Sequence, residues 1–272
     1  MGLHTGLYGY MGAKFAESDR LTDLFKKKNR SGQKIDRFVD TNFGAGNIVS
    51  AAAGIYSERI SNDLDPQIAL LADVVSRPED RKKTLDIMLT MEVSKEQFKK
   101  NLKIAEDEHA DRIQRAAAIW STFRMSYRGD RRVYWQWDNY KDMLLNKIEL
   151  LDTFNGVQIK NMDMIELLTQ EKRNPELMER TFYYLDPPYI YNKVSYKINR
   201  IDEKFHKTLT EVMAGIPYIM ISGYDNEIYE ENLVKKLGFH KYVLCHKYDY
   251  ISQCKEGTRA PRTEVIWTSY PV

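Results

Sequence analysis

The chain has 272 residues, 43% of them hydrophobic and 29% charged, and a formal net charge of +2 at pH 7. This length fits one domain with a large insertion or two domains, and the hydrophobic share is ample for a core. A net charge so near zero excludes a global excess of positive charge, so any nucleic-acid surface must be a local patch. Two cysteines and the lack of a long apolar run predict a reduced, cytoplasmic protein without a disulfide framework or a membrane span.

The first patterned segment is a short glycine-containing loop that ends in a lysine, Tyr8-Gly-Tyr-Met-Gly-Ala-Lys14. A helix is predicted to follow from Ser18 to Lys28, because the apolar residues of this stretch fall on one helical face. On the loop alone, a solvated Lys14 is the favoured interpretation.

A second glycine loop has a clearer context. A short strand, Arg37 to Asp40, leads into Thr41-Asn-Phe-Gly-Ala-Gly-Asn47, and a helix of small residues is predicted from Ile48 to Gly54. A strand, a Gly-x-Gly turn and a helix in this order let the backbone approach a ligand closely. Val49 takes the place of the third glycine of a dinucleotide fingerprint, which argues against pyrophosphate binding.

A strand near Tyr56 to Asn62 ends at Asp63, which follows the glycines by roughly twenty residues. An acidic residue in this position usually binds the hydroxyls of a ribose. Asp65-Pro66 predicts a helix start. The residues alone leave open whether Asp63 binds a ribose or only caps a helix.

About eighty residues then separate the second strand from the third, far more than an α/β connection needs. Helices are predicted over Arg77 to Thr90 and Ser94 to Trp120, with a hairpin at Gly129-Asp130 and a helix from Asp138 to Leu151. Between Trp120 and Tyr140, arginines alternate with aromatic residues. This pattern favours contact with nucleic acid over a purely structural hairpin. The arginines are Arg124, Arg128, Arg131 and Arg132, and the aromatics include Phe123, Tyr127, Tyr134, Trp135 and Trp137.

After a strand over 156–160 and a helix over 162–170, the strand Thr181 to Leu185 runs into Asp186-Pro-Pro-Tyr189. The prolines stop the strand on a stiff turn at its carboxyl end, where ligands bind in open α/β sheets. A planar amine fits this turn, with its hydrogens on the Asp186 carboxylate and the Pro187 carbonyl and the Tyr189 ring on its face. Two acceptors would draw the nitrogen toward a tetrahedral geometry and expose its lone pair. The alternative is a plain strand-ending turn.

The remaining chain alternates strands with helices. A polar loop, Ile190 to Arg200, is either a flap over the site or an ordinary solvated loop. Helices are predicted over 202–215 and 226–237, the second ended by Gly238, and strands over 217–222, 240–247 and 263–270. The five histidines show no metal-ligand spacing, so no metal is expected.

Together these segments resemble the Dam-like DNA adenine methyltransferases, which have the order lysine loop, glycine loop, insertion, Asp-Pro-Pro-Tyr. Tyr10-Met-Gly-Ala-Lys14 is similar to the opening motif of that family, with Ala13 in place of its second glycine, and the end of the chain is similar to its final strand. The resemblance implies a three-layer α/β/α methyltransferase fold, Rossmann-like, with a seven-stranded mixed sheet. Residues 1–76 and 152–272 would form the catalytic domain, and 77–151 an inserted target-recognition domain.

The resemblance also implies S-adenosylmethionine as the methyl donor and S-adenosylhomocysteine as the product. The missing pyrophosphate pattern agrees with such a donor, which has no phosphate. The implied donor-binding residues are Tyr10, Gly12, Lys14, Asp40, Gly44, Gly46, Asp63 and Asp163. The implied catalytic residues are Asp186, Pro187 and Tyr189, and the DNA-binding residues are Arg124, Tyr127, Arg128, Arg131, Arg132 and Lys197.

The expected partner is double-stranded DNA, bound by a monomer that flips the target adenine out of the helix. The sequence leaves open whether a restriction endonuclease acts separately on the same DNA. Two alternatives also stay open at this point. One is methylation of an RNA adenine or a protein glutamine amide by the same kind of turn, and the other is a non-catalytic DNA-binding relative.

Overall fold

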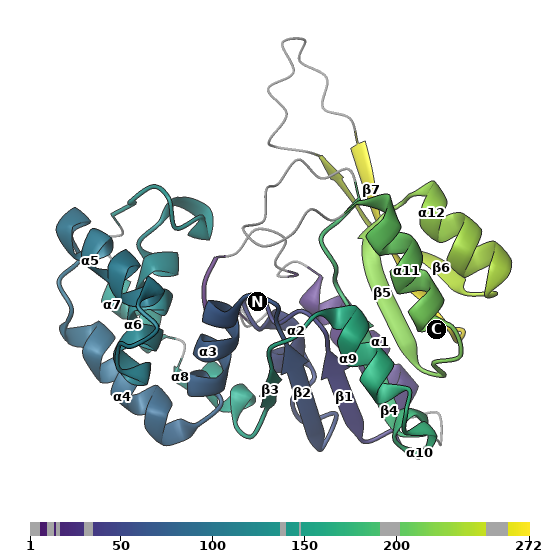
Figure 1. The fold of residues 1–272 in the computed structure, drawn as a ribbon, viewed down its shortest axis with the longest axis horizontal. Helices are drawn as coiled ribbons and strands as arrows, with labels where there is room; N and C mark the ends of the chain where they lie inside the picture. The colour runs from purple at the N-terminus through teal and green to yellow at the C-terminus, as the bar shows by residue number, and fades with distance from the viewer. Residues whose placement is uncertain are drawn as a thin grey trace, which may run out of the picture. The chain divides into compact units, whose positions relative to one another are not determined.

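A computed structural model describes residues 6–9, 14, 17–29, 35–136, 140–146, 148–190, 202–248 and 261–272 (Figure 1). Two compact units divide the chain. Unit 1 comprises Met1–Lys26 and Phe43–Met162, and unit 2 comprises Lys27–Asn42 and Asp163–Val272. The predicted insertion, 77–151, lies wholly within unit 1. Among the helices of the described ranges, none combines the length and the apolar character that a membrane crossing requires.

The strands form a seven-stranded mixed sheet in the order β3-β2-β1-β4-β5-β7-β6, which confirms the predicted α/β fold class. Strand β1 pairs with β4, β4 with β5 and β2 with β3 in parallel, whereas β7 is antiparallel to both β5 and β6. The strands are β1 (Arg37–Asp40), β2 (Glu58–Asn62), β3 (Gln158–Lys160), β4 (Thr181–Leu185), β5 (Ile219–Tyr224), β6 (His240–Tyr248) and β7 (Pro261–Thr268).

Unit 1 is built around one buried helix, α6 (Arg112–Arg124), whose residues from Ala116 to Arg124 are all buried. Helices α3, α4 and α5 pack against it. Its central side chain, Trp120, is fully buried and donates from its indole nitrogen to the Leu7 carbonyl at 3.3 Å. The other helices that lie within this unit are α2 (Asn47–Ala51), α3 (Pro66–Val75), α4 (Pro78–Thr90), α5 (Lys95–Glu106), α7 (Tyr140–Leu145) and α8 (Ile148–Leu151).

The single helix predicted over Ser94 to Trp120 is wrong, because α5 and α6 are separate helices. Two aspartates explain the break. The Asp107 carboxylate accepts from the His109 amide at 3.0 Å, and the Asp111 carboxylate accepts from the amides of Ile113 and Gln114. Such local side-chain hydrogen bonds compete with a continuing helix and favour a cap.

The predicted hairpin is present, but its two arms are joined by one isolated β-bridge and do not form paired strands. A 3₁₀ turn, Tyr127–Gly129, lies between two short segments that meet in a single bridge of Ser126 with Tyr134. Two backbone hydrogen bonds flank this bridge, from Tyr127 to Val133 and from Trp135 to Met125.

Unit 2 places helices α9 (Met164–Glu171) and α11 (Glu203–Met213) side by side, in front of strands β4 and β5 in Figure 1. Arg37 on β1 binds Glu171 on α9 through both of its terminal nitrogens, at 2.5 and 2.9 Å. The predicted helix over 226–237 is a short α-turn, α12 (Glu227–Tyr229), continued by a π-helix, η3 (Glu230–Lys236). Gly238 ends it with a φ of 71°, as predicted. Helix α10 (Pro175–Glu179) was not predicted, and α1 (Ser18–Asn29) matches its prediction within one residue.

Candidate active site

The glycine loop between β1 and α2 requires glycine at Gly46. This residue has a φ of 79° and its amide donates to the Phe43 carbonyl at 2.7 Å, which closes the turn before α2. A Cβ atom at this position would lie 2.6 Å from the Phe154 ring and 2.9 Å from the Phe43 ring. Gly44 also has a positive φ, of 51°. The predicted Gly-x-Gly turn is therefore a tight turn in which glycine is required at 46 by the positive φ and by the two phenylalanine rings packed there.

The amino-terminal segment 6–9 lies along this loop. The Leu7 amide donates to the Ala45 carbonyl at 2.9 Å, and the Tyr8 hydroxyl donates to the Gly44 carbonyl at 2.6 Å. The Tyr8 ring stacks on Phe123 of α6, with centroids 4.1 Å apart. Lys14 is 3% exposed, so the solvated lysine favoured on the loop alone is wrong. Tyr10 and Gly12 lie outside the described residues.

Asp63 links the glycine loop to the start of α3. Its Oδ2 accepts from the Gly44 amide at 3.0 Å and its Oδ1 accepts from the Asp65 amide at 2.9 Å. Burial raises the pKa of Asp63 to about 6, against the lowering effect of these hydrogen bonds. Each carboxylate oxygen has a second lone pair, so the same carboxylate can still accept from a ligand hydroxyl. The helix itself is capped by Asp65, which accepts from the Gln67 amide at 2.8 Å.

Two further acids stand at or just after the carboxyl ends of strands. Asp40, the last residue of β1, is fully buried and accepts from the Asn42 amide at 3.1 Å. Asp163 follows β3 and caps α9, accepting from the Ile165 amide at 2.8 Å. Their positions match the ends of strands at which α/β proteins bind ligands.

The Asp-Pro-Pro-Tyr turn follows β4 and is held by side chains from β5 and β7. The Ser222 hydroxyl lies 3.0 Å from Asp186 Oδ1 and 2.9 Å from the Tyr184 hydroxyl. The Tyr189 hydroxyl donates to Glu264 Oε1 at 2.7 Å. The rings of Tyr189 and Tyr224 pack edge to face, with 4.7 Å between their centroids.

Burial and the neighbouring carboxylates of Asp186 and Glu264 hold the pKa of Tyr189 well above its usual value. The pKa of Tyr184 is raised in the same way, first by burial and then by Asp186. Both phenols are therefore hydrogen-bond donors at neutral pH and not bases. The turn thus presents a half-buried carboxylate and an aromatic ring, each fixed by a neighbour on another strand.

Ser222 and Glu264 were not among the predicted site residues. They lie 36 and 75 positions from the residues that they contact, so no local spacing connects them to the turn. The only available signal was the similarity of the last strand, which contains Glu264, to the final strand of the Dam-like family.

Two of the arginines expected to bind DNA lie in the interior of unit 1. Arg124 is 6% exposed, and among the described residues its Nε and Nη2 have no hydrogen-bond partner. Burial lowers the pKa of Arg124 to about 10. Arg131 is 8% exposed, donates to Thr122 Oγ1 at 2.9 Å and to Gln67 Oε1 at 2.5 Å, and lies 4.9 Å from the centre of the Phe123 ring. These placements correct the expectation of direct base contact for both residues.

The exposed members of the predicted DNA-binding set are Tyr127, which is 43% exposed, and Arg132. The Tyr127 ring lies 5.3 Å from that of Trp135, which is 47% exposed. This pair is the exposed aromatic surface of the hairpin. The side chain of Arg128 and the whole of Lys197 lie outside what the structure describes.

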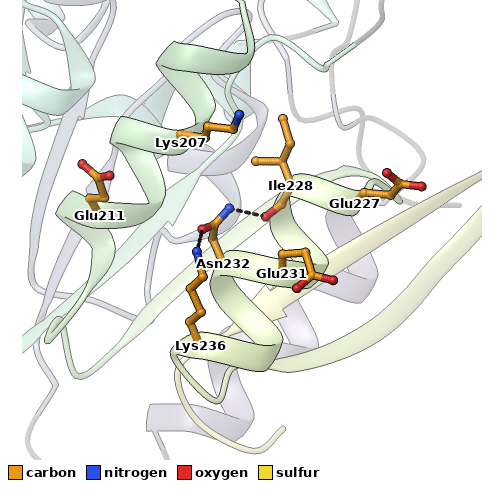
Figure 2. A pocket seen from close by; sticks show the side chains of 7 residues that line it. All are labelled: Lys207, Glu211, Glu227, Ile228, Glu231, Asn232 and Lys236. Atoms are coloured by element: carbon orange, nitrogen blue, oxygen red, sulfur yellow. Dashed lines mark hydrogen bonds between the residues drawn. The ribbon is translucent and has the colours of Figure 1, made fainter.

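A polar pocket of about 400 Å³ lies in unit 2 between α11 and the α12–η3 helix (Figure 2). Lys236 donates to Asn232 at 2.8 Å, and Asn232 donates in turn to the Ile228 carbonyl at 2.8 Å. None of the predicted site residues lines this pocket. This pocket is therefore separate from the predicted catalytic residues, which lie at the turn after β4.

A mixed α/β sheet with a glycine loop after β1 and an Asp-Pro-Pro-Tyr turn after β4 is the arrangement that the resemblance to the Dam-like methyltransferases implies. The model of the family described as D12 class N6 adenine-specific DNA methyltransferase matches residues 10–248, and the chain belongs to this family. The resemblance to the Dam-like enzymes is thereby confirmed, and the function of the protein is adenine-specific DNA methylation.

No curated protein matches the chain. Two solved structures of the rRNA methyltransferase AviRa from Streptomyces viridochromogenes are similar to it, both with a TM-score of 0.38 and with sequence identities of 11% and 13%. Each match covers 92% of this chain and 84% of the other. A likeness of this size supports nothing further about the chain.

Proposed function

We propose that the protein transfers the methyl group of S-adenosylmethionine to the exocyclic amino nitrogen of an adenine in double-stranded DNA. The observation that carries this proposal is the turn after β4, where Ser222 fixes the Asp186 carboxylate and Glu264 fixes the Tyr189 ring. S-adenosylmethionine supplies a methyl group on a positively charged sulfur. The remaining chemistry belongs to the residues of the chain.

Asp186 and the Pro187 carbonyl accept the two hydrogens of the adenine amino group. Because its lone pair is delocalised into the ring, a free adenine amine is a poor nucleophile, and these two acceptors favour a geometry that localises the pair. The carboxylate that accepts from Ser222 retains lone pairs for the amine. The phenol of Tyr189 stays protonated, so its ring serves as a stacking surface. Alignment of nitrogen and methyl carbon provides most of the rate enhancement.

The donor fits the chemistry of the acids and the glycine loop. Asp63 accepts from the ribose hydroxyls through its remaining lone pairs, and its hydrogen bond from the Gly44 amide holds it beside the glycine loop. Lys14 pairs with the carboxylate of the methionine moiety and Asp40 with its ammonium group. Asp163 binds near the adenine ring of the donor. Tyr10 and Gly12 complete the proposed set.

The acceptor adenine is extruded from the duplex, at a cost of about a few kcal/mol, because its amino group is out of reach while it is stacked. Tyr127 and Arg132, two exposed residues of the hairpin, contact the DNA together with Arg128 and Lys197. Arginine suits phosphate and base-edge contacts, and an exposed aromatic ring suits a base or sugar.

Methylation-sensitive sequencing of plasmid DNA from cells that express the chain tests this proposal. N6-methyladenine in one sequence context is the expected result, and an Asp186→Ala variant expressed at the same level is the control that should leave the plasmid unmodified. Purified protein with isotope-labelled donor and the same DNA should reproduce the result. Label in RNA or protein with none in duplex DNA would overturn the choice of acceptor. Transfer that proceeds without S-adenosylmethionine would overturn the choice of donor.

A further inference from the structure

We propose that Glu264 is a positioning residue for the methyl-transfer reaction. Its carboxylate fixes the tip of the Tyr189 ring, and the place of this ring sets the orientation of the acceptor adenine. The inference rests on the proposed role of Tyr189 as a stacking surface and extends it to a residue of the last strand.

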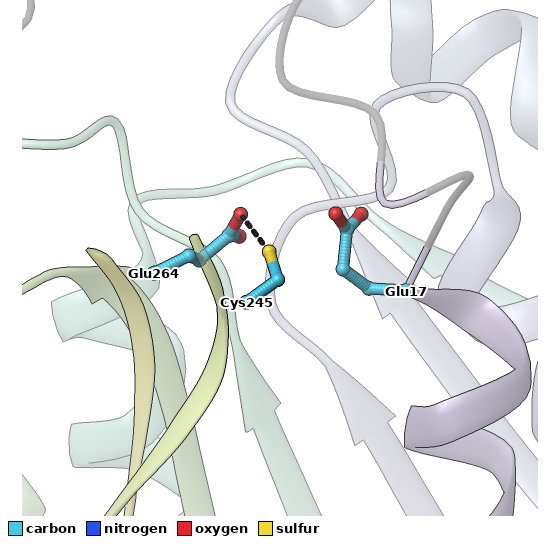
Figure 3. Close-up of side chains that lie close together, drawn as sticks. All are labelled: Glu17, Cys245 and Glu264. Atoms are coloured by element: carbon cyan, nitrogen blue, oxygen red, sulfur yellow. Dashed lines mark hydrogen bonds between the residues drawn. The ribbon is translucent and has the colours of Figure 1, made fainter. Parts of the chain in front are cut away.

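Glu264 is held on both sides by its strand neighbours. It is 1% exposed and lies on β7 opposite Tyr224 of β5 and Cys245 of β6. The register of β6 shifts between Val243 and Cys245, and such a bulge re-aims the side chains beside it. The Cys245 thiol lies 3.8 Å from Glu264 Oε2. Figure 3 shows these two side chains pointing toward each other. The carboxylate has a fixed position from which it can orient another group.

Two contacts within the described part of the chain hold the Tyr189 ring. Its hydroxyl, at the far end of the ring, donates to Glu264 Oε1 at 2.7 Å. Its body packs edge to face against Tyr224, with an interplanar angle of 72°. The hydroxyl oxygen lies on the axis about which the ring rotates, so its hydrogen bond fixes the position of the ring tip, and the packing on Tyr224 limits the rotation of the ring plane. Together these contacts hold the ring in place before a base arrives.

A structural role alone is a poor explanation for an acid at this position. Ile266, the next residue of β7 on the same face of the strand, is buried and apolar, and an apolar side chain at 264 would pack beside it. Burying a carboxylate is costly unless hydrogen bonds compensate it. The phenol of Tyr189 provides one such bond, and its raised pKa keeps the phenol protonated as a donor at neutral pH.

Three variants of the full-length protein test the proposal. Glu264→Leu removes the acceptor at a similar volume, Glu264→Gln keeps an acceptor oxygen, and Tyr189→Phe keeps the ring but removes the donor. We expect kcat to fall about tenfold for Glu264→Leu and for Tyr189→Phe, because each loses the same hydrogen bond to a charged group. The double variant Glu264→Leu/Tyr189→Phe should be no slower than either of these single variants. Glu264→Gln should keep most of the wild-type kcat.

Donor affinity and fluorescence separate positioning from folding. The dissociation constant for S-adenosylmethionine should stay within about twofold of wild type in all three variants, because the hydrogen bond orients only the acceptor base. Duplexes with 2-aminopurine at the target position should report a bound base with altered stacking in Glu264→Leu and Tyr189→Phe. Thr268→Val, a buried site of β7 whose hydroxyl binds only the Tyr270 carbonyl among the described residues, is the matched control and should leave kcat unchanged.

Additive losses in the double variant, or a Glu264→Gln protein as slow as Glu264→Leu, would overturn the proposal. If Glu264→Leu fails to fold, the kcat values of Tyr189→Phe, Glu264→Gln and the variant with both changes are compared. The variant with both changes should then be no slower than Tyr189→Phe alone, and an additive loss would again overturn the proposal. Failure of the proposed function would look different, since wild type itself would then give no N6-methyladenine.

Discussion

A single serine hydroxyl connects Asp186 to the strand beside it. Because Ser222 Oγ lies within 3.0 Å of Asp186 and 2.9 Å of the Tyr184 hydroxyl, the phenol donates to the serine and the serine to the carboxylate. Tyr184 keeps its proton, since burial and Asp186 raise its pKa. The orientation of the reacting carboxylate is therefore set by the sheet and not by solvent.

Asp186→Ala should lower the rate of methyl transfer by on the order of 10³-fold, because the acceptor that localises the amine lone pair is lost. Donor affinity should be unchanged within about twofold, since no proposed contact to the donor is removed. Label transfer to a duplex measures the first quantity and calorimetry the second. Equal loss of both would contradict the role assigned to Asp186.

Donor binding should weaken as the pH falls through about 6, because burial raises the pKa of Asp63 to about 6 and a protonated carboxyl accepts ribose hydroxyls poorly. Calorimetric titrations above and below this pH measure the change, and Asp63→Asn should bind weakly with no such pH dependence.

The pH dependence that Asp63 gives to the free energy of unfolding has the opposite sign. In the unfolded chain Asp63 ionises near 3.8, so its contribution to stability is lost as the pH rises through about 6. Protonation of Asp63 therefore does not unfold the protein in the range where affinity falls.

The residues of the turn could be predicted because Asp186, Pro187 and Tyr189 are adjacent in sequence, and proline restricts the backbone in a known way. The residues that hold this turn, Ser222 and Glu264, could not be predicted, because only the pairing of β4, β5 and β7 brings them to it. The predicted DNA contacts of Arg124 and Arg131 are wrong for a related reason. Arginine alternating with aromatic residues indicates a binding surface when the side chains are exposed, and these two are buried.

At the scale of elements, the turn between β1 and α2 depends on one glycine. Gly46→Ala should destabilise the protein by about 3 kcal/mol, because it places a Cβ at a φ of 79° and within 2.6 Å of Phe154. Gly54→Ala is the matched control, since Gly54 has a φ of 73° but nothing within 4 Å of an added Cβ. It should cost about 1 kcal/mol. Urea unfolding measures both, and equal losses would show that the Phe154 contact is unimportant.

The elements themselves were largely predictable where caps and breakers are local. Asp65-Pro66 begins α3 and Gly238 ends η3, both as the residue types indicate. The break between α5 and α6 was missed because the charged stretch around Asp107 and Asp111 has good helix periodicity on either side. The break lets α5 and α6 pack against each other, and side-chain caps stabilise it, neither of which periodicity reports.

Across the whole molecule, buried tyrosines set the upper limit of pH stability. Burial raises the pKa of several of the 18 tyrosines, to about 12 for Tyr140 and higher for Tyr183, Tyr184, Tyr189 and Tyr229. The unfolded chain releases these protons near the ordinary value of 10.0 and the folded chain does not. The stabilisation is thus present below that pH and is lost as the pH rises above it.

The free energy of unfolding should therefore fall steeply above pH 10, and tyrosinate absorbance at these sites should appear only with unfolding. Urea titrations at increasing alkaline pH, followed by circular dichroism and by ultraviolet absorbance, measure the two together. A flat stability curve through this range, or absorbance that rises while the fold is intact, would contradict the assignment of these phenols to the interior.

The stacking of Tyr8 on Phe123 has a consequence for experiments on specificity. Phe123 belongs to the helix that leads into the hairpin, whereas Tyr8 donates to the Gly44 carbonyl of the glycine loop. Under the proposed function, this contact joins the hairpin that binds the duplex to the loop that binds the donor. We therefore predict that variants of the helix made to retune sequence preference also change donor affinity, and that by thermodynamic reciprocity the donor changes duplex affinity by the same factor.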